Sequence, residues 1–530
     1  MNKRTLRACA LGLLLGFPIP VGAREINLVQ NPGFEIVDPS TQQPANYELK
    51  GAAFRGYLGG WEDFATNGII FPGQAPNGGS VSQMVLGLDQ SKGRWISFRF
   101  RGLAEDGFSV PDDSLKMKIE FYSKNGTDYL DCASKPFYGE IELDRKNLTT
   151  NGDYHLGGAA VWRSYEMEEL LPFPEVDSVR IIVEYGTGIA TRSYHAAFLI
   201  DDFSLVQRTR SLTGLVDPAE RIPAANTSAP PDTSKLLSLG GRWYYEPAPG
   251  ETVDPSNLTV TDENADRLFY KSDRLINPFL NNMTAWLRAG YKDEQGNIVT
   301  QDQFVPDNVV LLFQGDGFLT VKSKNLPNHP TAKFPGFNPS YIQEMSRTYR
   351  LPLEPVINPD AIAMTAHDTN RALPMGSIGI AVNGVVFFNP FDANMNDASN
   401  IMDYCCGHPN PNNQYHYHKY PICVNTPFVD KGEGPSQVIG FAFDGLPIYG
   451  PYQEAGVMAR DSTTNPLNAF NACYDDVRGW HYHVTPGKFP YLIGGYFAKA
   501  ELSNFVSSFR GPPGANFPPA ADWLQSPPPR

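Results

Sequence analysis

Two short histidine-containing segments lie near the C-terminal end of the 530-residue chain: Tyr415-His416-Tyr417-His418 and Trp480-His481-Tyr482-His483. In a β-strand, residues i and i+2 point to the same face with Cα atoms about 6.5 Å apart, so each histidine pair would share one face. Imidazole nitrogens at that spacing can bind one metal ion about 2 Å from each ring. Because burying four imidazoles without partners is costly, we expect His416, His418, His481 and His483 to converge on one ion. The alternative is a polar or aromatic role in a β-rich core.

Neutral histidine ligands suit zinc or copper, and the sequence does not choose between them. Zinc would lower the pKa of a bound water and allow hydrolysis or lyase-type proton abstraction. Copper beside Tyr415, Tyr417 or Tyr482 would favour oxidative chemistry. A second hypothesis is non-catalytic: the domain captures metal, or the ion stabilises the fold of a cell-surface protein. Structural sites are closed whereas catalytic sites keep an open position, so many histidine ligands would favour this hypothesis. Whether the chain is an enzyme therefore stays open.

The residues around these histidines, from 236 to 511, are expected to form a β-rich domain with a few short helices. Two turn signals support this: Asn383-Gly384 and Asp444-Gly445 each separate two apolar runs. Such dipeptides adopt the positive φ angles of tight β-hairpins. Turn chemistry is also the favoured role of Asp444 over catalysis.

An earlier region, residues 24–207, has the period-2 pattern of half-buried strands, for example in Lys116-Met117-Lys118-Ile119-Glu120-Phe121. It is expected to be a separate β-sandwich. Residues 208–235 are rich in proline and alanine and predict a flexible linker. The last residues, 512–530, form a Pro-rich tail. The fold class is thus mainly β, with two folded units.

The first 23 residues predict a signal peptide, with a basic start, an apolar run and small residues before the expected cleavage point. The chain should therefore be secreted, periplasmic or on the cell surface. The apolar run is shorter than the roughly 20 residues that span a membrane, and we expect no transmembrane segment. A formal net charge of −14 without a basic stripe argues against nucleic acid as a partner.

Five of the six cysteines follow the predicted signal peptide, and four of them fall within one stretch. In an exported protein, clustered cysteines favour two disulfides. A bond between the adjacent Cys405 and Cys406 would be strained, so these two are expected to pair separately with the other two. A cysteine-rich metal site is the competing interpretation. The four residues concerned are Cys405, Cys406, Cys423 and Cys473.

Residues from about 320 to 511 resemble the YHYH domain family. The matching segments are Lys324–Thr331, Gly379–Val385, Asp403–Pro409, Gln414–His418, Ile439–Tyr452 and His481–Thr485. One departure is Trp480, where the family has tyrosine. The resemblance adds His329 and His408 as candidate metal ligands, because both lie in matching segments. Six candidate ligands exceed one four-coordinate ion, so some would lie outside the first shell or the site would hold two ions.

The two ends of the first region, Asn27–Glu35 and Ile200–Leu205, resemble galactose-binding-like jelly rolls, a fold shared by many carbohydrate-binding modules. The resemblance implies a structural calcium bound by Glu35 with Asp202 or Asp201, since calcium prefers oxygen ligands. Trp61 and Trp162 would stack on a sugar ring, although a tryptophan in a sandwich is more often part of the core. The implied partner is a polysaccharide or cell-surface glycan.

Overall fold

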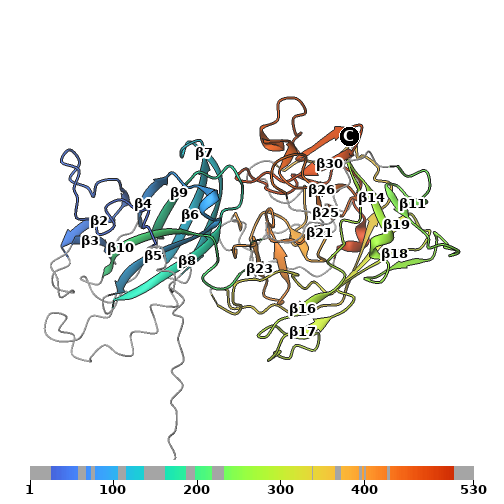
Figure 1. Cartoon of the computed structure of the whole chain (residues 1–530), viewed down its shortest axis with the longest axis horizontal. Helices are drawn as coiled ribbons and strands as arrows, with labels where there is room; N and C mark the ends of the chain where they lie inside the picture. The colour runs from blue at the N-terminus through green and yellow to red at the C-terminus, as the bar shows by residue number, and fades with distance from the viewer. Residues whose placement is uncertain are drawn as a thin grey trace, which may run out of the picture.

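A computed structural model describes residues 25–57, 67–72, 78–104, 115–136, 162–186, 197–215, 217, 232–336, 338–364, 372–392, 397–398, 402–426 and 430–505. The predicted signal peptide, the Pro-rich tail, Trp61 and most of the predicted linker lie outside these residues. Within them the chain is mainly β, as the sequence predicts (Figure 1). The short helices among the described residues are 3-10 turns: η1 (Gln90–Lys92), η4 (Ala265–Arg267), η6 (Ala459–Asp461) and η7 (Leu502–Asn504). None of the helices in this part of the chain is long and apolar enough to cross a membrane.

The first region is a sandwich of two five-stranded antiparallel sheets. One sheet has the order β1 (Glu48–Gly51), β4 (Gly79–Leu86), β9 (Ser178–Tyr185), β6 (Leu115–Ser123), β7 (Asp128–Pro136). The other has the order β2 (Phe54–Tyr57), β3 (Asn67–Pro72), β10 (Ala197–Arg208), β5 (Trp95–Ala104), β8 (Arg163–Leu170).

Alternation of side chains builds the sandwich core. In β6 every second residue from Leu115 to Ser123 is buried, which is the pattern of a strand with one face on a core. The inner faces of both sheets contribute to one apolar cluster. Phe203 lies within it, with its ring centroid 5.2 Å from that of Phe98 and 5.1 Å from that of Phe34. The expected jelly-roll sandwich is confirmed.

The second region contains several smaller sheets around one long sheet. Two four-stranded sheets are formed by β11 (Leu237–Gly240), β12 (Trp243–Tyr245), β14 (Leu268–Lys271), β15 (Leu275–Ile276) and by β13 (Leu258–Val260), β18 (Val309–Phe313), β19 (Phe318–Ser323), β20 (Arg347–Pro352). Two hairpins are formed by β16 (Ala285–Leu287), β17 (Gln303–Val305) and by β27 (Tyr452–Glu454), β28 (Val457–Met458).

The long sheet has eight strands and carries the histidine segments. Its order is β23 (Gly407–Pro409), β24 (Tyr415–Tyr417), β22 (Val386–Phe388), β21 (Ser377–Ala381), β25 (Val438–Ala442), β26 (Pro447–Tyr449), β30 (Gly479–His483), β29 (Ala472–Asp475). Both predicted hairpins are present, β21–β22 and β25–β26, and their turn glycines have φ angles of 84° and 85°.

This sheet is an internal duplication. The antiparallel pair β21–β25 lies at its centre, and from there each half continues with a hairpin partner, a parallel strand and an antiparallel edge strand. In sequence, residues 377–390 (SIGIAVNGVVFFNP) align with 438–451 (VIGFAFDGLPIYGP), and residues 403–418 align with 468–483. The two histidine segments therefore occupy equivalent strands, β24 and β30.

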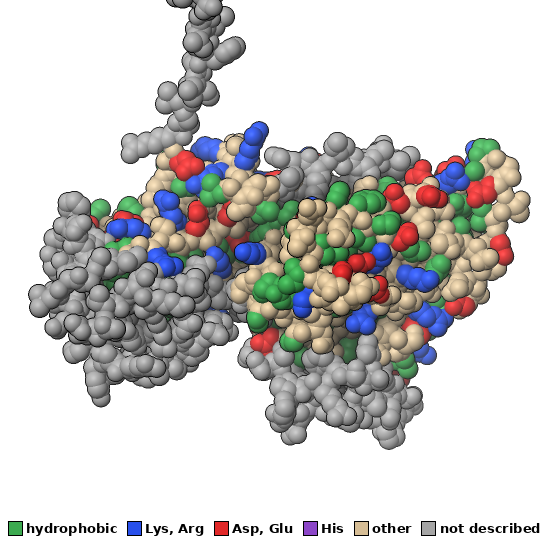
Figure 2. Space-filling view, turned by 90° about the horizontal axis from the view of Figure 1, so that it is seen from below, with side chains coloured by type: hydrophobic (Ala, Val, Ile, Leu, Met, Phe, Trp, Pro, Cys, Tyr) green, Lys and Arg blue, Asp and Glu red, His purple; other side chains and the backbone are tan. Residues whose placement is uncertain are grey.

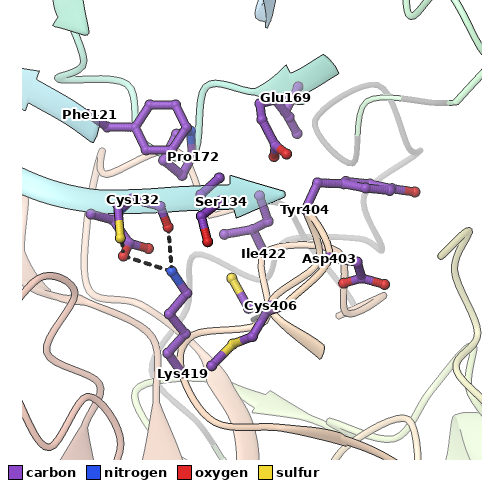
Figure 3. A pocket seen from close by; sticks show the side chains of 14 residues that line it. Phe121, Cys132, Ser134, Glu169, Pro172, Asp403, Tyr404, Cys406, Lys419 and Ile422 are labelled. Carbon is purple, nitrogen blue, oxygen red and sulfur yellow. Dashed lines mark hydrogen bonds and ion pairs between the residues drawn. The ribbon is translucent and has the colours of Figure 1, made fainter. Parts of the chain in front are cut away.

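The sandwich packs directly against the second region, whereas the sequence predicts only a flexible linker between them. Lys419 is buried at the interface, where its Nζ donates to Asp131 Oδ1 at 2.9 Å and to the Cys132 carbonyl at 2.6 Å (Figure 3). Tyr452 joins the apolar core of the sandwich and donates its hydroxyl to Glu175 Oε2 at 2.6 Å. These contacts join segments almost 300 residues apart, which no local pattern predicts.

Glu169 lines a small cavity at this interface, and we expect it to make stability depend on pH. Burial, reinforced by the negative charge of Asp403, raises the pKa of Glu169 from 4.5 to about 8. Between these pH values the folded state keeps a proton that the unfolded chain has lost. Stability is therefore greatest below about pH 4.5 for this group and falls by up to about 1.4 kcal/mol per pH unit as the pH rises toward 8.

The test is urea unfolding of the wild type and Glu169→Gln at pH 5 and pH 8. The amide stays neutral, so the variant should lose less stability across this interval than the wild type. Equal losses in the two proteins would contradict the assignment.

Candidate metal centres

Three imidazoles meet at one edge of the eight-stranded sheet; we call His408, His416 and His418 the histidine triad. His408 lies on β23 directly opposite His416 on β24, and His418 follows that strand on the same face. His416 Nε2 is 2.9 Å from His418 Nε2, which is 3.2 Å from His408 Nε2. Two nitrogens about 2.0–2.1 Å from one tetrahedral ion would be roughly 3.3 Å apart, so the spacing fits a shared ion.

The outer nitrogens of the triad determine where the ring protons are. His416 Nδ1 donates to the Gln414 carbonyl at 2.9 Å, and His418 Nδ1 donates to the Asn389 carbonyl at 2.5 Å. In neutral rings the Nε2 atoms of both then carry lone pairs. His408 differs, because its Nδ1 accepts from the Asn338 amide at 3.1 Å and its proton is therefore on Nε2. The 2.9 Å contact between His416 and His418 thus joins two acceptors.

Burial keeps these rings neutral. All three triad residues are buried, and the Phe388 ring stacks on His416 with centroids 3.9 Å apart. Loss of hydration lowers the pKa of His408 and His416 well below 6.5 and that of His418 to about 4. A proton shared between His416 and His418 is therefore disfavoured at neutral pH, and the pair is set to accept a cation.

The equivalent place in the other half of the sheet holds Cys473, His481 and His483, which we call the cysteine–histidine cluster. Their potential ligand atoms all lie within 4.8 Å of one another, and all three side chains are buried. His481 Nδ1 donates to the Gly479 carbonyl and His483 Nδ1 to the Gly450 carbonyl, both at 2.7 Å. Their Nε2 atoms therefore carry lone pairs, as in the triad. The lone pair of His481 faces Cys473 Sγ at 3.4 Å, and that of His483 accepts from Arg478 Nη1 at 3.4 Å.

The expected convergence of all four motif histidines is wrong. The strands β24 and β30 are separated by four others in the long sheet, which at about 4.8 Å per strand puts the two pairs on the order of 20 Å apart. No single ion can bind both pairs. The sequence pattern identifies the shared face within each pair, whereas the order of strands comes from tertiary packing.

Tyrosines of the same segments point to the opposite face and hold the hairpin turns. The Tyr417 hydroxyl is 2.9 Å from Asn383 Nδ2, and the Tyr482 hydroxyl donates to Asp444 Oδ2 at 2.5 Å. Burial raises the pKa of Asp444 to about 6. Asp444 Oδ1 also accepts from the backbone of Leu446, which is a turn role as the sequence suggests.

His329 lies on this tyrosine face and not in the triad. Its Nε2 is 2.6 Å from the Tyr417 hydroxyl and its Nδ1 is 2.8 Å from the Pro330 carbonyl. Potential ligand atoms within 4.8 Å of its ring nitrogen are the sulfurs of Cys405 and Cys423. Because these two sulfurs are bonded to each other, they do not provide thiolates.

One of the two predicted disulfides is present. Cys405 and Cys423 are joined, with Cα atoms 5.2 Å apart. The prediction of a second disulfide is wrong, because Cys406 and Cys473 are free thiols. Cys406 packs in an apolar cluster with Met402. Cys473 belongs to the cysteine–histidine cluster in the other half of the sheet.

Thiol counting checks this assignment. When denatured without reduction, the chain after its predicted signal peptide should be alkylated at Cys132, Cys406 and Cys473. Cys405 and Cys423 should react only after a reductant is added. Peptide mass spectrometry distinguishes the sites, and alkylation of Cys405 before reduction would contradict the bond.

The residues of the predicted calcium site lie close together. Glu35 and Asp201 both lie beside Gly33. A methyl group placed on Gly33, as in alanine, would be 4.0 Å from Glu35 Cγ and 3.7 Å from Asp201 Oδ1. Both carboxylates accept protein hydrogen bonds: Glu35 from the backbone and amide of Asn67, and Asp201 from the backbone of Asp202. Asp202 is exposed. Calcium at this place stays a prediction.

Trp162 is half-buried beside a small apolar cluster of the sandwich. The Arg101 guanidinium carbon lies over its ring, 5.3 Å from the centroid, and Arg101 Nε donates to Asp202 at 2.6 Å. Sugar stacking on Trp162 stays a prediction.

Sequence reasoning grouped Cys473 with the disulfides and missed its place beside two histidines. The signal that could identify it is the internal repeat, which aligns Cys473 with His408. It also missed Asn338 and Arg478. Asn338 contacts His408, and Arg478 Nη1 lies 3.4 Å from His483 Nε2.

Comparison with known proteins gives a family for part of the chain. Residues 348–475 match the family described as YHYH protein. No curated protein shows significant similarity to the sequence.

Solved structures similar to this chain include TmCBM61 in complex with β-1,4-galactotriose, with 16% identity, coverage of 34% of this chain and 99% of that chain, and a TM-score of 0.21. The CBM22-1 xylan-binding domain of Paenibacillus barcinonensis Xyn10C is 15% identical, with coverage of 35% of this chain and 97% of that chain and a TM-score of 0.21. A CBM28 module specific for non-crystalline cellulose is 10% identical, with coverage of 34% of this chain and 96% of that chain and a TM-score of 0.22.

The family match shows that residues 348–475 of this chain are a YHYH domain, and the histidine triad lies inside it.

Proposed function

We propose that the chain is an exported metal-binding protein whose YHYH domain holds a transition-metal ion in the histidine triad. The observation that carries this proposal is the 2.9 Å contact between His416 Nε2 and His418 Nε2. Both rings give their Nδ1 protons to backbone carbonyls, so two lone pairs face each other. A cation bound by both nitrogens would replace this repulsion with two coordinate bonds.

The donor set fits zinc or divalent copper. Three neutral imidazoles are borderline ligands of the kind that both ions accept. Two of them are already in the required tautomer. His408 would need its proton on Nδ1, and its hydrogen bond from Asn338 Nδ2, which also donates to the Pro409 carbonyl, would be lost. The backbone carbonyls that orient His416 and His418 have the role of outer-shell partners, which fix ring orientation and raise ligand basicity.

Holding the ion is favoured over catalysis. The triad rings are buried, whereas a catalytic centre keeps a position open to its substrate. The phenols of Tyr415 and Tyr417 are hydrogen-bonded on the opposite face, to Asp403 and to Asn383 and His329. This arrangement does not support copper–tyrosine oxidative chemistry or a water-activating zinc site. An ion here would stabilise the fold or be stored.

The sandwich would direct the YHYH domain to a polysaccharide. Among the described residues on the face seen in Figure 2, acidic and basic side chains are interspersed and form no basic stripe of the kind that nucleic acid requires. Affinity electrophoresis in gels containing xylan, β-1,4-galactan or amorphous cellulose tests the targeting role. We expect retardation in one of them and less retardation of Trp162→Ala. Unchanged mobility in all three gels would remove glycan targeting and leave the metal proposal standing.

The metal proposal is tested by equilibrium dialysis of chelator-stripped protein against zinc or divalent copper, with elemental analysis of the dialysed protein. The wild type should retain one ion more per chain than His416→Ala. Equal retention by the two proteins would overturn the proposal. Circular dichroism of both stripped proteins shows whether the variant is folded.

A further inference from the structure

The duplication of the eight-stranded sheet places a second set of ligand atoms where the triad has its own. Cys473 lies directly opposite His481, as His408 lies opposite His416. The Tyr449 ring packs on His481 and His483, with centroids 5.0 and 5.8 Å away, in the place of Phe388. The carbonyls that orient both rings also come from equivalent positions of the repeat.

The two halves differ in the third ligand, which is a thiol in one and an imidazole in the other. Cys473 Sγ is 3.4 Å from His481 Nε2. Gln453 Nε2 donates to the same sulfur at 3.4 Å and would stabilise negative charge on it. Thiolate ligands select softer cations than imidazole or carboxylate ligands do.

The charges around the cluster also differ from those of a typical divalent site. Arg478 is buried; its Nη1 donates to His483 Nε2 at 3.4 Å, a bond that a metal ion would replace, and its Nε donates to Asp475 Oδ2 at 2.6 Å. These two charges compensate each other. One thiolate and two neutral imidazoles then balance a monovalent cation. A divalent ion would bind more weakly, because it adds one uncompensated positive charge beside Arg478.

We propose that Cys473, His481 and His483 form a second, separate metal centre for a soft, thiophilic cation, copper(I) in first place. Binding converts the thiol to a sulfur–metal bond, and the thiol proton passes to solvent; no electron is transferred. The inference deepens the proposed function and shares its premise that these histidine pairs hold ions. It assigns different ions to the two halves of one duplicated sheet.

The test uses cobalt(II) as a spectroscopic probe on chelator-stripped full-length protein under reducing conditions. We expect a thiolate-to-cobalt charge-transfer band in the near ultraviolet for the wild type. The double variant His416→Ala/His418→Ala should keep the band, because the triad contains no sulfur. Cys473→Ser should abolish it, and copper(I) should bleach it in the wild type at one equivalent.

Two further variants keep the result interpretable. Cys406→Ser removes another buried thiol and should leave the band unchanged. Cys473→His copies the triad, and it should bind cobalt without the sulfur band. A wild type that retains zinc or copper through His416 but never shows the band would overturn this inference while leaving the proposed function intact. A band that survives Cys473→Ser would overturn it as well.

Discussion

His418→Ala is expected to weaken zinc or divalent copper binding by at least 100-fold. His418 is the central ligand of the triad, within 3.2 Å of both other Nε2 atoms. Loss of an outer-shell partner already lowers metal affinity by about 10–100-fold, so loss of a direct ligand should do more. Competition with a chromophoric chelator measures the change.

The matched control is His329→Ala, which removes a buried histidine that contacts Tyr417 on the opposite face of β24. It should change affinity only a few-fold, although it also loses a hydrogen bond to Tyr417. If the bound ion stabilises the fold, saturating metal should raise the thermal midpoint of His329→Ala and not that of His418→Ala. Equal affinity losses in the two variants would show that the effect comes from damage to the domain and not from a lost ligand.

Lys419→Met is expected to destabilise the protein by about 3–5 kcal/mol, because it leaves Asp131 as an uncompensated charge at a buried interface. The Lys419 and Asp131 side chains are 5% and 8% exposed, so solvent does little to screen the pair. Chemical denaturation monitored by tryptophan fluorescence measures the loss. Limited proteolysis should cleave the variant faster between the sandwich and the YHYH domain.

The double variant Lys419→Met/Asp131→Leu distinguishes loss of the Lys419–Asp131 ion pair from the cost of leaving Asp131 charged and buried without a partner. Replacing both members of a buried ion pair by apolar residues is often neutral or stabilising, so the double variant should recover most of the stability. A double variant as unstable as Lys419→Met would show that the hydrogen bond from Lys419 to the Cys132 carbonyl, and not the charge pair, determines docking.

Local chemistry explains which features the sequence predicts correctly. Period-2 alternation predicts the sandwich strands, and Asn-Gly and Asp-Gly predict the two hairpins, because neighbouring residues determine both features. The shared face of His416 and His418 follows from strand geometry in the same way. The resemblance supplied His408, whose position on β23 no spacing rule gives.

The errors concern long-range pairing. The two histidine pairs are separated because β21 and β25 pair at the centre of the sheet, so that the two halves extend in opposite directions from this pair. The second disulfide fails for the same reason, since Cys473 lies on the far half from Cys406. The docking of Lys419 on Asp131 was missed because apolar and charge patterns of one domain do not specify the surface of another.

Anomalous X-ray diffraction from crystals of the zinc-loaded protein, collected on both sides of the zinc absorption edge, tests the central claim most directly. We predict an anomalous peak bounded by the Nε2 atoms of His416 and His418, with His408 as the third ligand, and its disappearance in crystals of His416→Ala. Full zinc loading in solution with no peak at the triad would contradict the account.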